Sequence, residues 1–479
     1  MVNAAEKKYR IERIASWDKA SQFRQSPKHL GFWYYKMLGR FYQFLTPKDL
    51  SVLEIGCGHG DILAGVKPSY GVGVDFSHKM IQVAQQKYPD LHFLCADAHQ
   101  LNLKKKFDVI ILSDLVINLW DVQSVFEKLH YFSHPRTRII LNFPNNLWRV
   151  PMSIARRLGF TVDYMEQNWF APNDIFNLLH LAGFEVIKHT PQILIPLRIK
   201  YLSKFINRFF TSIIPFSWFA LTTFAVARQE PGRNSIELKK EPSVSVIVPA
   251  RNEAGNIENI INRIPKFGSK TEIIFVEGHS ADDTYETIKN TIKKYPEKNC
   301  SIYRQEGYGK GDAVRLGFDK AVGDVLMILD ADITVPPESL PRFFNTLISG
   351  RGEFINGVRL VYPVNNQAIR FLNMVGNKLF SLIFSWLLGQ PIKDTLCGTK
   401  VLWRKDYLSI AKNRNYFGDF DPFGDFDLLF GAAKLNLKIV DLPIRYDQRV
   451  YGTTNIKRWK HGWILLKMAT YAAFRIKFI

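Results

Sequence analysis

The chain has 479 residues, a hydrophobic fraction of 47% and a formal net charge of +20. This length predicts two or three globular domains, and four scattered cysteines (Cys57, Cys95, Cys300 and Cys397) exclude a disulfide framework or a cysteine-rich zinc site. The basic balance predicts an anionic partner such as nucleic acid, phospholipid or a phosphorylated substrate. No apolar run reaches the ~18 residues of a membrane span, and the basic N-terminus lacks the apolar segment of a signal peptide. We therefore expect a cytoplasmic protein with reduced thiols.

The first fifty residues are basic and aromatic and predict lead-in helices. Residues 51–55 then form a short apolar strand that runs into three alternating glycines, Gly56, Gly58 and Gly60. Glycines at such a turn let the backbone approach a ligand closely. The next three predicted strands end in acids: Asp75, Asp97 and Asp114. Asp75 stands 19 positions after Gly56, which suits a contact with ribose hydroxyls.

Glu54 completes the motif Glu-x-Gly-x-Gly-x-Gly, and the region from about residue 45 to residue 228 resembles the class I S-adenosylmethionine-dependent methyltransferases. The resemblance implies a doubly wound α/β fold that binds S-adenosylmethionine. It places Glu54 and the glycines at the methionine side, Asp75 at the ribose and Asp97 at the adenine. The implied cofactor-binding residues are Glu54, Gly56, Gly58, Gly60, Asp75, Phe76, Asp97, Ala98 and Ser113. A domain that only binds the cofactor, as a scaffold or regulatory module, remains an open alternative.

The sequence does not reveal the methyl acceptor. The run from Asn142 to Asn145 is interpreted as a strand-end turn, and residues 191–218, rich in Ile, Leu, Phe and Lys or Arg, as a lid or a membrane-facing helix. A nucleic-acid methyltransferase would explain the basic charge, but the chain has no helix-turn-helix, zinc-finger or RNA-binding signature. We therefore expect no nucleic-acid partner.

Residues 229–242 are polar, charged and bracketed by prolines, which is typical of a linker. This predicts one domain over residues 1–228 and a second over residues 243–479. The second begins another series of alternating strands and helices, so the fold class is two tandem α/β, Rossmann-like domains.

In this second series an apolar run from residue 325 ends in Asp330 and Asp332, followed by a proline pair. Residues two apart on an extended chain point the same way, so the two carboxylates are predicted to bind one Mg²⁺ or Mn²⁺ at the end of a strand. A glycine turn with Lys310 precedes this strand, and its flexible backbone and positive charge suit a diphosphate.

Several motifs of the second half together resemble the GT-A fold, family 2 glycosyltransferases, and most closely those that charge polyprenyl phosphates, such as the dolichyl-phosphate mannose synthases. The motifs are Pro-Ala-Arg-Asn-Glu at 249–253, Gly-Lys-Gly at 309–311, Asp-Ala-Asp at 330–332 and the run 449–455. The family's Val-Asp-Asp-Gly-Ser is replaced here by Val-Glu-Gly-His-Ser at 276–280, which leaves the nucleotide base open.

The resemblance implies metal-dependent, inverting transfer of a hexose from a GDP- or UDP-sugar to a polyprenyl phosphate or a related glycan acceptor. The implied substrate-binding residues are Pro249, Arg251, Glu253, Glu277, Ser280, Lys310, Asp312, Arg359, Arg370, Asn377 and Arg449. The candidate catalytic carboxylates are Asp330, Asp332, Asp394, Asp425 and Asp427. A sugar hydroxyl as acceptor would need one of the last three as a general base, whereas an acceptor phosphate is already ionised; a structural role for these three is equally open.

The C-terminal segment 456–479 contains no acid. On a helix Lys457, Lys460, Lys467 and Arg475 fall in one stripe, and Trp463, Leu466, Ala473 and Phe474 lie away from it. Such a helix suits the headgroup region of an anionic membrane, and residues 371–388 are interpreted as a second such element. The protein is therefore expected to be peripheral on the inner face of the cell membrane. The alternative is a terminal helix packed on its own domain.

Overall fold

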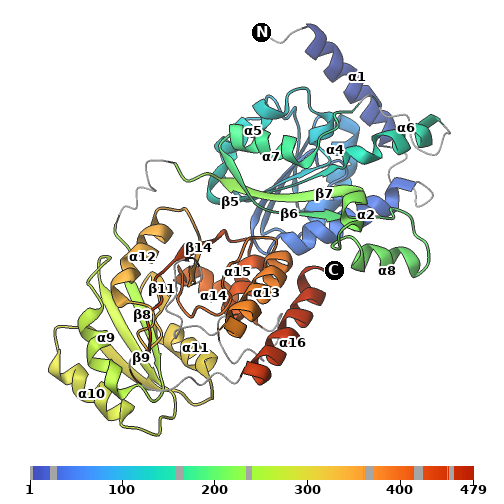
Figure 1. Ribbon diagram of the computed structural model, residues 1–479. Helices are drawn as coiled ribbons and strands as arrows, with labels where there is room; N and C mark the ends of the chain where they lie inside the picture. Colours follow the sequence, from blue (N-terminus) through green and yellow to red (C-terminus); the bar gives the residue numbers. More distant parts are fainter. Residues whose placement is uncertain are drawn as a thin grey trace. The chain divides into compact units, whose positions relative to one another are not determined.

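The computed structural model describes residues 4–21, 30–157, 165, 167–232, 240–359, 361, 371–414, 424, 426–449, 451 and 458–478, and Figure 1 shows its helices and strands. The chain divides into two compact units, with the division after Glu230. Each unit is built around one seven-stranded sheet. The predicted site residues Arg370 and Asp425 lie outside the described residues.

The first unit carries a sheet of order β3-β2-β1-β4-β5-β7-β6, in which only β7 runs antiparallel to its neighbours. Its strands are β1 (Ser51–Ile55), β2 (Tyr70–Asp75), β3 (His92–Cys95), β4 (Phe107–Ser113), β5 (Ser133–Pro144), β6 (Phe184–Gln192) and β7 (Thr222–Gln229). Its α-helices are α1 (Ala4–Ala20), α2 (Leu30–Leu45), α3 (Asp61–Gly65), α4 (His78–Lys87), α5 (Val122–Phe132), α6 (Arg149–Arg157), α7 (Pro172–Leu181) and α8 (Leu202–Phe209). Short 3₁₀ turns are η1 (Val116–Asn118), η2 (Asn146–Trp148) and η3 (Phe216–Phe219).

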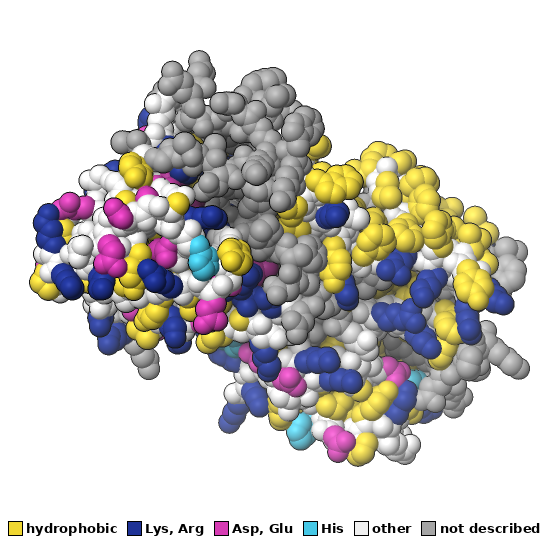
Figure 2. Space-filling view, turned by 90° about the horizontal axis from the view of Figure 1, so that it is seen from below, with side chains coloured by type: hydrophobic (Ala, Val, Ile, Leu, Met, Phe, Trp, Pro, Cys, Tyr) yellow, Lys and Arg dark blue, Asp and Glu magenta, His cyan; other side chains and the backbone are white. Residues whose placement is uncertain are grey.

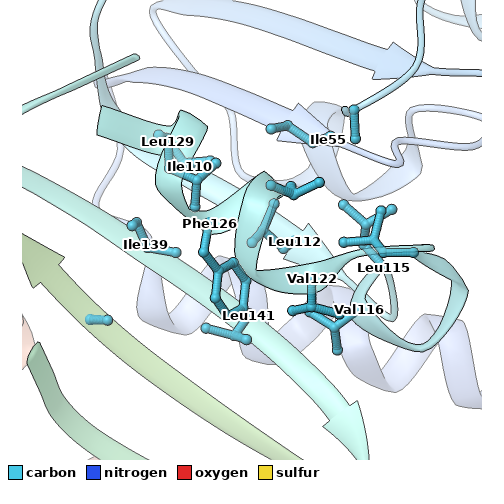
Figure 3. Close-up of a cluster of buried hydrophobic side chains, with 14 of the residues drawn as sticks. Ile55, Ile110, Leu112, Leu115, Val116, Val122, Phe126, Leu129, Ile139 and Leu141 are labelled. Atoms are coloured by element: carbon cyan, nitrogen blue, oxygen red, sulfur yellow. The ribbon is translucent and has the colours of Figure 1, made fainter. Parts of the chain in front are cut away.

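The central strands of this sheet, such as β1 and β4, are buried and apolar on both faces, as expected for strands that helices cover on both sides. Successive strand residues point to opposite faces, so alternate positions of β4 belong to two separate cores. Ile110 and Leu112 lie in one core, and Val109 and Ile111 in the other. Figure 3 shows the first core, where side chains of β4 and β5 meet those of α5. Parallel sheets are typically buried in this way, and the packing fixes the carboxyl edge of the sheet, where the acids lie.

The second unit has a sheet of order β10-β9-β8-β11-β13-β12-β14, with β13 antiparallel to both of its neighbours. Its strands are β8 (Val244–Ala250), β9 (Thr271–Glu277), β10 (Cys300–Arg304), β11 (Val325–Ile328), β12 (Phe354–Val358), β13 (Lys400–Trp403) and β14 (Ile439–Pro443). Its α-helices are α9 (Ile257–Arg263), α10 (Thr284–Lys294), α11 (Lys310–Lys320), α12 (Leu340–Ile348), α13 (Phe371–Leu388), α14 (Arg404–Lys412), α15 (Phe426–Lys434) and α16 (Arg458–Ile476). The turns η4 (Ala254–Asn256) and η5 (Pro337–Ser339) precede α9 and α12.

The predicted fold class, two tandem Rossmann-like α/β domains, is confirmed by these two sheets. One local expectation is wrong. The strand before the paired acids ends at Ile328, and Asp330 and Asp332 lie in the turn that follows rather than on extended chain. The two carboxylates therefore do not share a direction by strand alternation, and each has its own basic partner.

The C-terminal helix also differs from its predicted pattern. Ala473, which was expected among the lipid-facing side chains, is buried in α16, a helix that packs against α13. Lys467 and Arg475 are exposed beside Leu466 and Phe474 rather than opposite them. Among the helices that the structure describes, none is both long and apolar enough to cross a bilayer.

Candidate active sites

In the first unit, a glycine turn joins β1 to α3 at the carboxyl edge of the sheet. Gly56, Gly58 and Gly60 have positive φ angles of 79°, 52° and 76°, which glycine adopts without steric cost. Glu54 is only 1% exposed, and its Oε2 accepts a hydrogen bond from the Leu63 N–H at 2.9 Å. This bond ties the strand to the helix and fixes the turn between them.

Asp75, at the end of β2, is held by the backbone. Its Oδ2 accepts a hydrogen bond from the Gly58 N–H at 2.9 Å, and its Oδ1 accepts one from the Ser77 N–H at 2.9 Å. With Gly56 and Phe76 it lines a pocket at the edge of the sheet. The carboxylate is thus fixed beside the pocket by the same turn that would hold a ligand.

The remaining walls of this pocket come from α1 and from the ends of the strands. The lining residues are Tyr9, Arg10, Arg13, Ile14, Ile55, Gly56, Val74, Asp75, Phe76, Ala96, Asp97, Ala98, His99, Leu115, Asn118, Leu119 and Trp120. Five residues predicted to bind cofactor therefore line one pocket. The other four, Glu54, Gly58, Gly60 and Ser113, lie in the structure that supports it.

Asp97 lies at the end of the pocket expected for an adenine ring. Its Oδ2 is 3.3 Å from Arg10 Nε, and its Oδ1 lies 2.7 Å from the His99 N–H and 2.8 Å from His99 Nδ1. Burial would raise the pKa of Asp97, but the hydrogen bonds from His99 and the charge of Arg10 hold this pKa below its usual value. The carboxylate is therefore ionised at neutral pH and can accept a hydrogen bond.

A second polar cluster lies beside the ends of β4 and β5. Asp114 has a φ of 47°, and its Oδ1 accepts hydrogen bonds from Tyr34 Oη at 3.1 Å and Asn142 Nδ2 at 2.6 Å. Asn142 Oδ1 in turn accepts bonds from Tyr42 Oη at 2.7 Å and Ser113 Oγ at 3.3 Å. The run from Asn142 was interpreted as a turn, and this is wrong: Asn142 is part of β5 and fully buried.

In the second unit, the first acid of the pair contacts the glycine–lysine turn. Lys310 is the first residue of α11, and its Nζ lies 2.7 Å from Asp330 Oδ1. Burial would raise the pKa of Asp330, but the charges of Lys310, Arg359 and Lys400 lower it. A Cβ atom on Gly398 would collide with both partners of the Lys310–Asp330 pair, so the following strand approaches this site closely only because residue 398 is glycine.

The second acid belongs to a separate charged cluster. Arg449 donates from Nη2 to Asp332 Oδ2 at 2.6 Å and from Nη1 to Glu253 Oε1 at 2.9 Å. Thr334 Oγ1 also donates to Asp332 Oδ1 at 2.7 Å. Burial raises the pKa of Glu253 to about 7, although Arg449 and Asn256 act to lower it. One guanidinium therefore joins the turn after β8 to the turn after β11.

The turn after β9 is the one that departs from the family pattern. Glu277 Oε1 accepts a hydrogen bond from the Ser280 N–H at 2.6 Å, and Ser280 Oγ accepts one from the Asn252 N–H at 3.1 Å. The His279 ring lies against Tyr308, with centroids 5.0 Å apart. Glu277 thus supports the turn, while His279 and Tyr308 stand at its surface.

Family models match both halves of the chain. Residues 52–135 match the model for a methyltransferase domain, and residues 245–408 match the model for glycosyl transferase family 2. The chain joins a methyltransferase domain to a family 2 glycosyltransferase domain. The two resemblances predicted from the motifs are thereby confirmed.

Curated relatives match the glycosyltransferase half. The dolichol-phosphate mannosyltransferase of Pyrococcus furiosus is 38% identical over 224 residues, which are 45% of this chain and 59% of the relative. The undecaprenyl-phosphate 4-deoxy-4-formamido-L-arabinose transferase of Pectobacterium carotovorum is 25% identical over 217 residues, which are 44% of this chain and 62% of the relative. The chain thus spans about three fifths of the length of these two relatives.

Among solved structures, a SAM-dependent methyltransferase from Thermotoga maritima is similar to this chain, with 15% identity and a TM-score of 0.34. The match covers 42% of this chain and 91% of that protein. A likeness at this level bears on neither activity nor substrate.

The glycosyltransferase unit offers a suitable donor set for a divalent cation, although its two acids now contact lysine and arginine. Asp330 and Asp332 supply carboxylate oxygens, the ligands that Mg²⁺ and Mn²⁺ prefer, and a substrate diphosphate usually completes such a site. Among the described residues, no group of three or more His, Cys, Asp or Glu side chains is arranged to hold a metal ion.

Asp394 forms a buried ion pair in the glycosyltransferase unit. It is fully buried, and Arg359 donates to it from Nε at 2.8 Å and from Nη2 at 3.0 Å, with Asn377 Nδ2 at 2.8 Å. Burial alone would raise the pKa of Asp394, but Arg359 and Asn377 hold it far below its usual value. Three predicted site residues are thus brought together, but their hydrogen bonds are to one another. A carboxylate with such a low pKa is a poor general base.

The other predicted glycosyltransferase residues are more dispersed. Arg251 is exposed and Pro249 half-buried at the end of β8. Asp312 Oδ2 accepts a hydrogen bond from the Gly307 N–H at 3.0 Å and closes the glycine turn. Asp427, in α15, pairs with Arg414 at 3.2 Å. The catalytic or binding roles of these residues stay predictions.

Helix α1 was predicted only as a lead-in helix, yet it forms one wall of the methyltransferase pocket. Tyr9 Oη donates to the Asn118 carbonyl at 3.2 Å, and Arg13 Nη1 donates to Asn118 Oδ1 at 2.6 Å. Tyr9 also packs edge-on against Trp120 at 5.2 Å. The Tyr9–Arg13 spacing of four residues, which places both on one helix face, was the only signal of this role in the sequence.

Proposed function

We propose that the glycosyltransferase unit transfers a hexose from a GDP- or UDP-sugar to a polyprenyl phosphate, with inversion, and that it requires Mg²⁺ or Mn²⁺. The observation that carries the proposal is the charge arrangement at the carboxyl ends of β8 and β11. There Lys310 is paired with Asp330, and Arg449 is paired with Asp332. The names of the curated relatives, which act on dolichol phosphate and undecaprenyl phosphate, support the acceptor class.

In the proposed mechanism the acidic side chains bind the cation and the basic side chains bind the diphosphate. Asp330 and Asp332 would hold the divalent cation, which neutralises charge on the leaving nucleoside diphosphate. Lys310 and Arg449, released from the two acids, would contact the diphosphate oxygens, because a basic group near a helix start favours phosphate. The ion pairs therefore hold the site in a neutral state until the substrate arrives with its own charge.

The acceptor needs no general base in this proposal. A phosphate monoester has a second pKa near 6 and is largely ionised at neutral pH, so it can attack the sugar C1 directly. This agrees with the state of Asp394, whose carboxylate is already occupied by Arg359 and Asn377. We assign Asp394 a positioning role: it holds Arg359, whose charge acts on Asp330.

We further propose that this unit works at the inner face of the cell membrane, where a polyprenyl acceptor resides. Helix α13 supports this. Its polar residues Ser381 and Ser385 face inward and donate to the Ile392 carbonyl at 2.7 and 3.1 Å. Leu379 and Leu382 are 57% and 61% exposed. In α16, Trp463, Leu466 and Phe474 are also exposed, next to Lys467 and Arg475.

For the methyltransferase unit we propose S-adenosylmethionine binding and methyl transfer to an acceptor whose identity the site does not define. The backbone-held Asp75 supports the ribose contact, and Asp97 supports the adenine contact. The Asp114–Tyr34–Asn142 cluster lies at the neighbouring strand ends, where an acceptor would approach. The alternative, a cofactor-binding scaffold, makes the same binding prediction but predicts no methylated product.

The test is a transfer assay with purified full-length protein, Mn²⁺ or Mg²⁺, a panel of nucleotide sugars and a short polyprenyl phosphate. The expected result is a glycosylated lipid from a GDP- or UDP-hexose, and its loss when a chelator is added in excess. Full activity in excess chelator would contradict the metal role. No transfer from any nucleotide sugar would contradict the proposed reaction.

A further inference from the structure

Helix α8 in the methyltransferase unit is packed with its polar side inward. Asn207 Oδ1 accepts hydrogen bonds from the Leu194 and Ile195 N–H groups at 2.9 and 2.8 Å, and its Nδ2 donates to the Ile195 carbonyl at 2.7 Å. On the outer side, Leu202 and Phe205 are 50% and 55% exposed. A surface helix of a water-soluble domain normally buries its apolar side, so α8 has the reverse arrangement.

The exposed apolar residues of α8 belong to a larger surface, which we call the α8–η3 face. It consists of the exposed large hydrophobic residues between positions 197 and 219. These are Leu197, Ile199, Tyr201, Leu202, Phe205, Ile213, Ile214, Phe216, Trp218 and Phe219. Leu147, Val150 and Ile154 of the adjoining η2–α6 segment are also exposed, at 60%, 65% and 52%. Scattered apolar side chains are normal on a protein surface, but a concentration like this marks an interaction site.

The backbone beneath this face is fixed. Asn145 Nδ2 donates to the Trp218 carbonyl at 2.8 Å, and Trp148 Nε1 donates to the Phe219 carbonyl at 2.9 Å. Phe210 and Phe216 also pack edge-to-face, with ring centroids 4.9 Å apart. The backbone that carries the exposed Trp218 and Phe219 is therefore held by the domain.

The charged residues in the segment between Glu185 and Glu230 are all basic. No Asp or Glu occurs between Glu185 and Glu230, whereas Arg198, Lys200 and Lys204 are exposed in that interval. Figure 2 shows hydrophobic side chains gathered on the side of the molecule where α8 lies, with Lys and Arg side chains next to them. Apolar side chains flanked by cations, without acids, complement a surface that is apolar inside and anionic at its boundary.

We propose that the α8–η3 face binds the surface of an anionic lipid bilayer. Its aromatic and aliphatic side chains enter the headgroup region, and the neighbouring lysine and arginine side chains contact lipid phosphates. Self-association through this face is disfavoured, because two copies would bring the same cations together. The proposal concerns the methyltransferase unit alone and depends neither on glycosyl transfer nor on α16.

The face adjoins the acceptor side of the methyltransferase sheet. Asn145 follows the last residue of β5, and Phe219 precedes β7 by three positions. Asn142 of β5 donates from Nδ2 to Thr222 Oγ1 of β7 at 3.0 Å. Docking through the α8–η3 face would thus bring the Asp114–Asn142 end of the sheet close to the lipid surface.

The test is co-sedimentation of the full-length protein with vesicles of phosphatidylcholine and phosphatidylglycerol. The variant Phe205→Ser/Trp218→Ser/Phe219→Ser should lower the partition coefficient roughly tenfold or more, because three inserted side chains are removed. A matched control, Tyr131→Ser/Leu181→Ser, removes side chains that are 74% and 57% exposed outside the face and should leave partitioning unchanged. Circular dichroism and the melting temperature verify that each variant is folded.

Two further variants test the cations of this face and the contribution of α16 separately. Lys200→Gln/Lys204→Gln should reduce partitioning to anionic vesicles but not to vesicles of phosphatidylcholine alone. Trp463→Ser/Leu466→Ser/Phe474→Ser, in α16, reports on the glycosyltransferase unit and should leave the binding by the α8–η3 face in place. The proposal is overturned if the folded triple variant in this face partitions like the wild type. It is also overturned if sedimentation velocity shows a dimer that this variant converts to a monomer.

Discussion

The two units place acids at the same position in their sheets, after the carboxyl ends of parallel strands, but hold them in different ways. Asp75 of the methyltransferase unit is fixed by two backbone N–H groups and faces a pocket. Asp330 and Asp332 of the glycosyltransferase unit are paired with Lys310 and Arg449. Asp75 contacts backbone donors, whereas Asp330 and Asp332 each also contact a basic side chain.

This difference follows from the charge of the proposed ligands. S-adenosylmethionine offers Asp75 neutral ribose hydroxyls, so a backbone-bonded carboxylate can accept from them without rearrangement. A nucleoside diphosphate and a divalent cation bring large opposite charges, and two isolated carboxylates would repel each other without a cation. In the proposed mechanism the lysine and arginine compensate the acids in the absence of ligand and would become available for phosphate if a metal binds.

The largest effect is expected from removing one of the two carboxylates that we propose as metal ligands. Asp332→Asn should abolish glycosyl transfer while leaving the melting temperature nearly unchanged, because the amide can still accept from Thr334 but carries no charge for a cation. The transfer assay with Mn²⁺ measures this directly. The control Glu338→Gln removes a carboxylate from an exposed ion pair with Arg263 and should retain activity. Wild-type rates for Asp332→Asn would show that the comparison between the two sites is mistaken.

Breaking the buried pair beside this site should destabilise the second unit. Arg359→Leu leaves Asp394 buried without its cation, and the free energy of unfolding should fall by about 3–5 kcal/mol. Urea denaturation followed by far-UV circular dichroism measures the loss in the transition of that unit. The exposed pair offers a control, since Arg263→Leu should cost less than about 1 kcal/mol. Equal effects of the two variants would contradict a structural role for the buried pair.

The backbone-held acid should have a smaller but specific effect on ligand binding. Asp75→Ala should weaken S-adenosylmethionine binding by about 2–3 kcal/mol, through the loss of charge-assisted hydrogen bonds. Isothermal titration calorimetry measures the affinity, with the exposed Asp61→Ala as control. Glycosyl transfer should be unaffected if the sites are independent. Equal affinities for the wild type and Asp75→Ala would remove the ribose assignment.

The smallest predicted effect concerns acid stability. The pKa of Asp97 in the folded protein lies below its unfolded value, so its contribution to stability is present above the unfolded pKa of about 3.9 and is lost as the pH falls through the folded pKa. Asp97→Asn should make the acid-side decline in the stability of the first unit shallower, by less than about 1 kcal/mol. The free energy of unfolding of the wild type and of Asp97→Asn is measured at several pH values between about 5 and about 2.5, a range that brackets the unfolded pKa of aspartate. An unchanged pH profile would show that the contacts with His99 and Arg10 do not persist in solution.

The sequence revealed those features that depend on neighbouring residues. The apolar run before Asp330 and the glycines after Glu54 are local patterns, and they predicted both sheets and the turns that carry the acids. The hydrogen bonds between distant side chains could not be predicted in this way. Arg449 and Glu253 are 196 positions apart in the sequence, and Arg13 and Asn118 are 105 positions apart. The strand-alternation argument for Asp330 and Asp332 also failed, since β11 ends before either residue.

The reversed polarity of α8 shows the same limit. Residues 191–218, rich in Ile, Leu, Phe and Lys or Arg, were interpreted as either a lid or a membrane-facing helix. Only the hydrogen bonds of Asn207 and the burial of Ser203 show that the polar side of α8 faces inward. Amphipathicity defines two faces of a helix, but the surrounding backbone determines which of them is exposed.

The most direct test of the contrast between the two sites is the binding of Mn²⁺ to wild-type protein and to Lys310→Met, measured by electron paramagnetic resonance with and without GDP or UDP. If Lys310 compensates Asp330 in the absence of ligand and then binds the diphosphate, Lys310→Met should bind Mn²⁺ alone more tightly than the wild type, because a competing cation is gone. The same variant should bind the nucleoside diphosphate with Mn²⁺ more weakly, because a phosphate contact is lost. Weaker binding of Mn²⁺ alone by Lys310→Met would contradict the account.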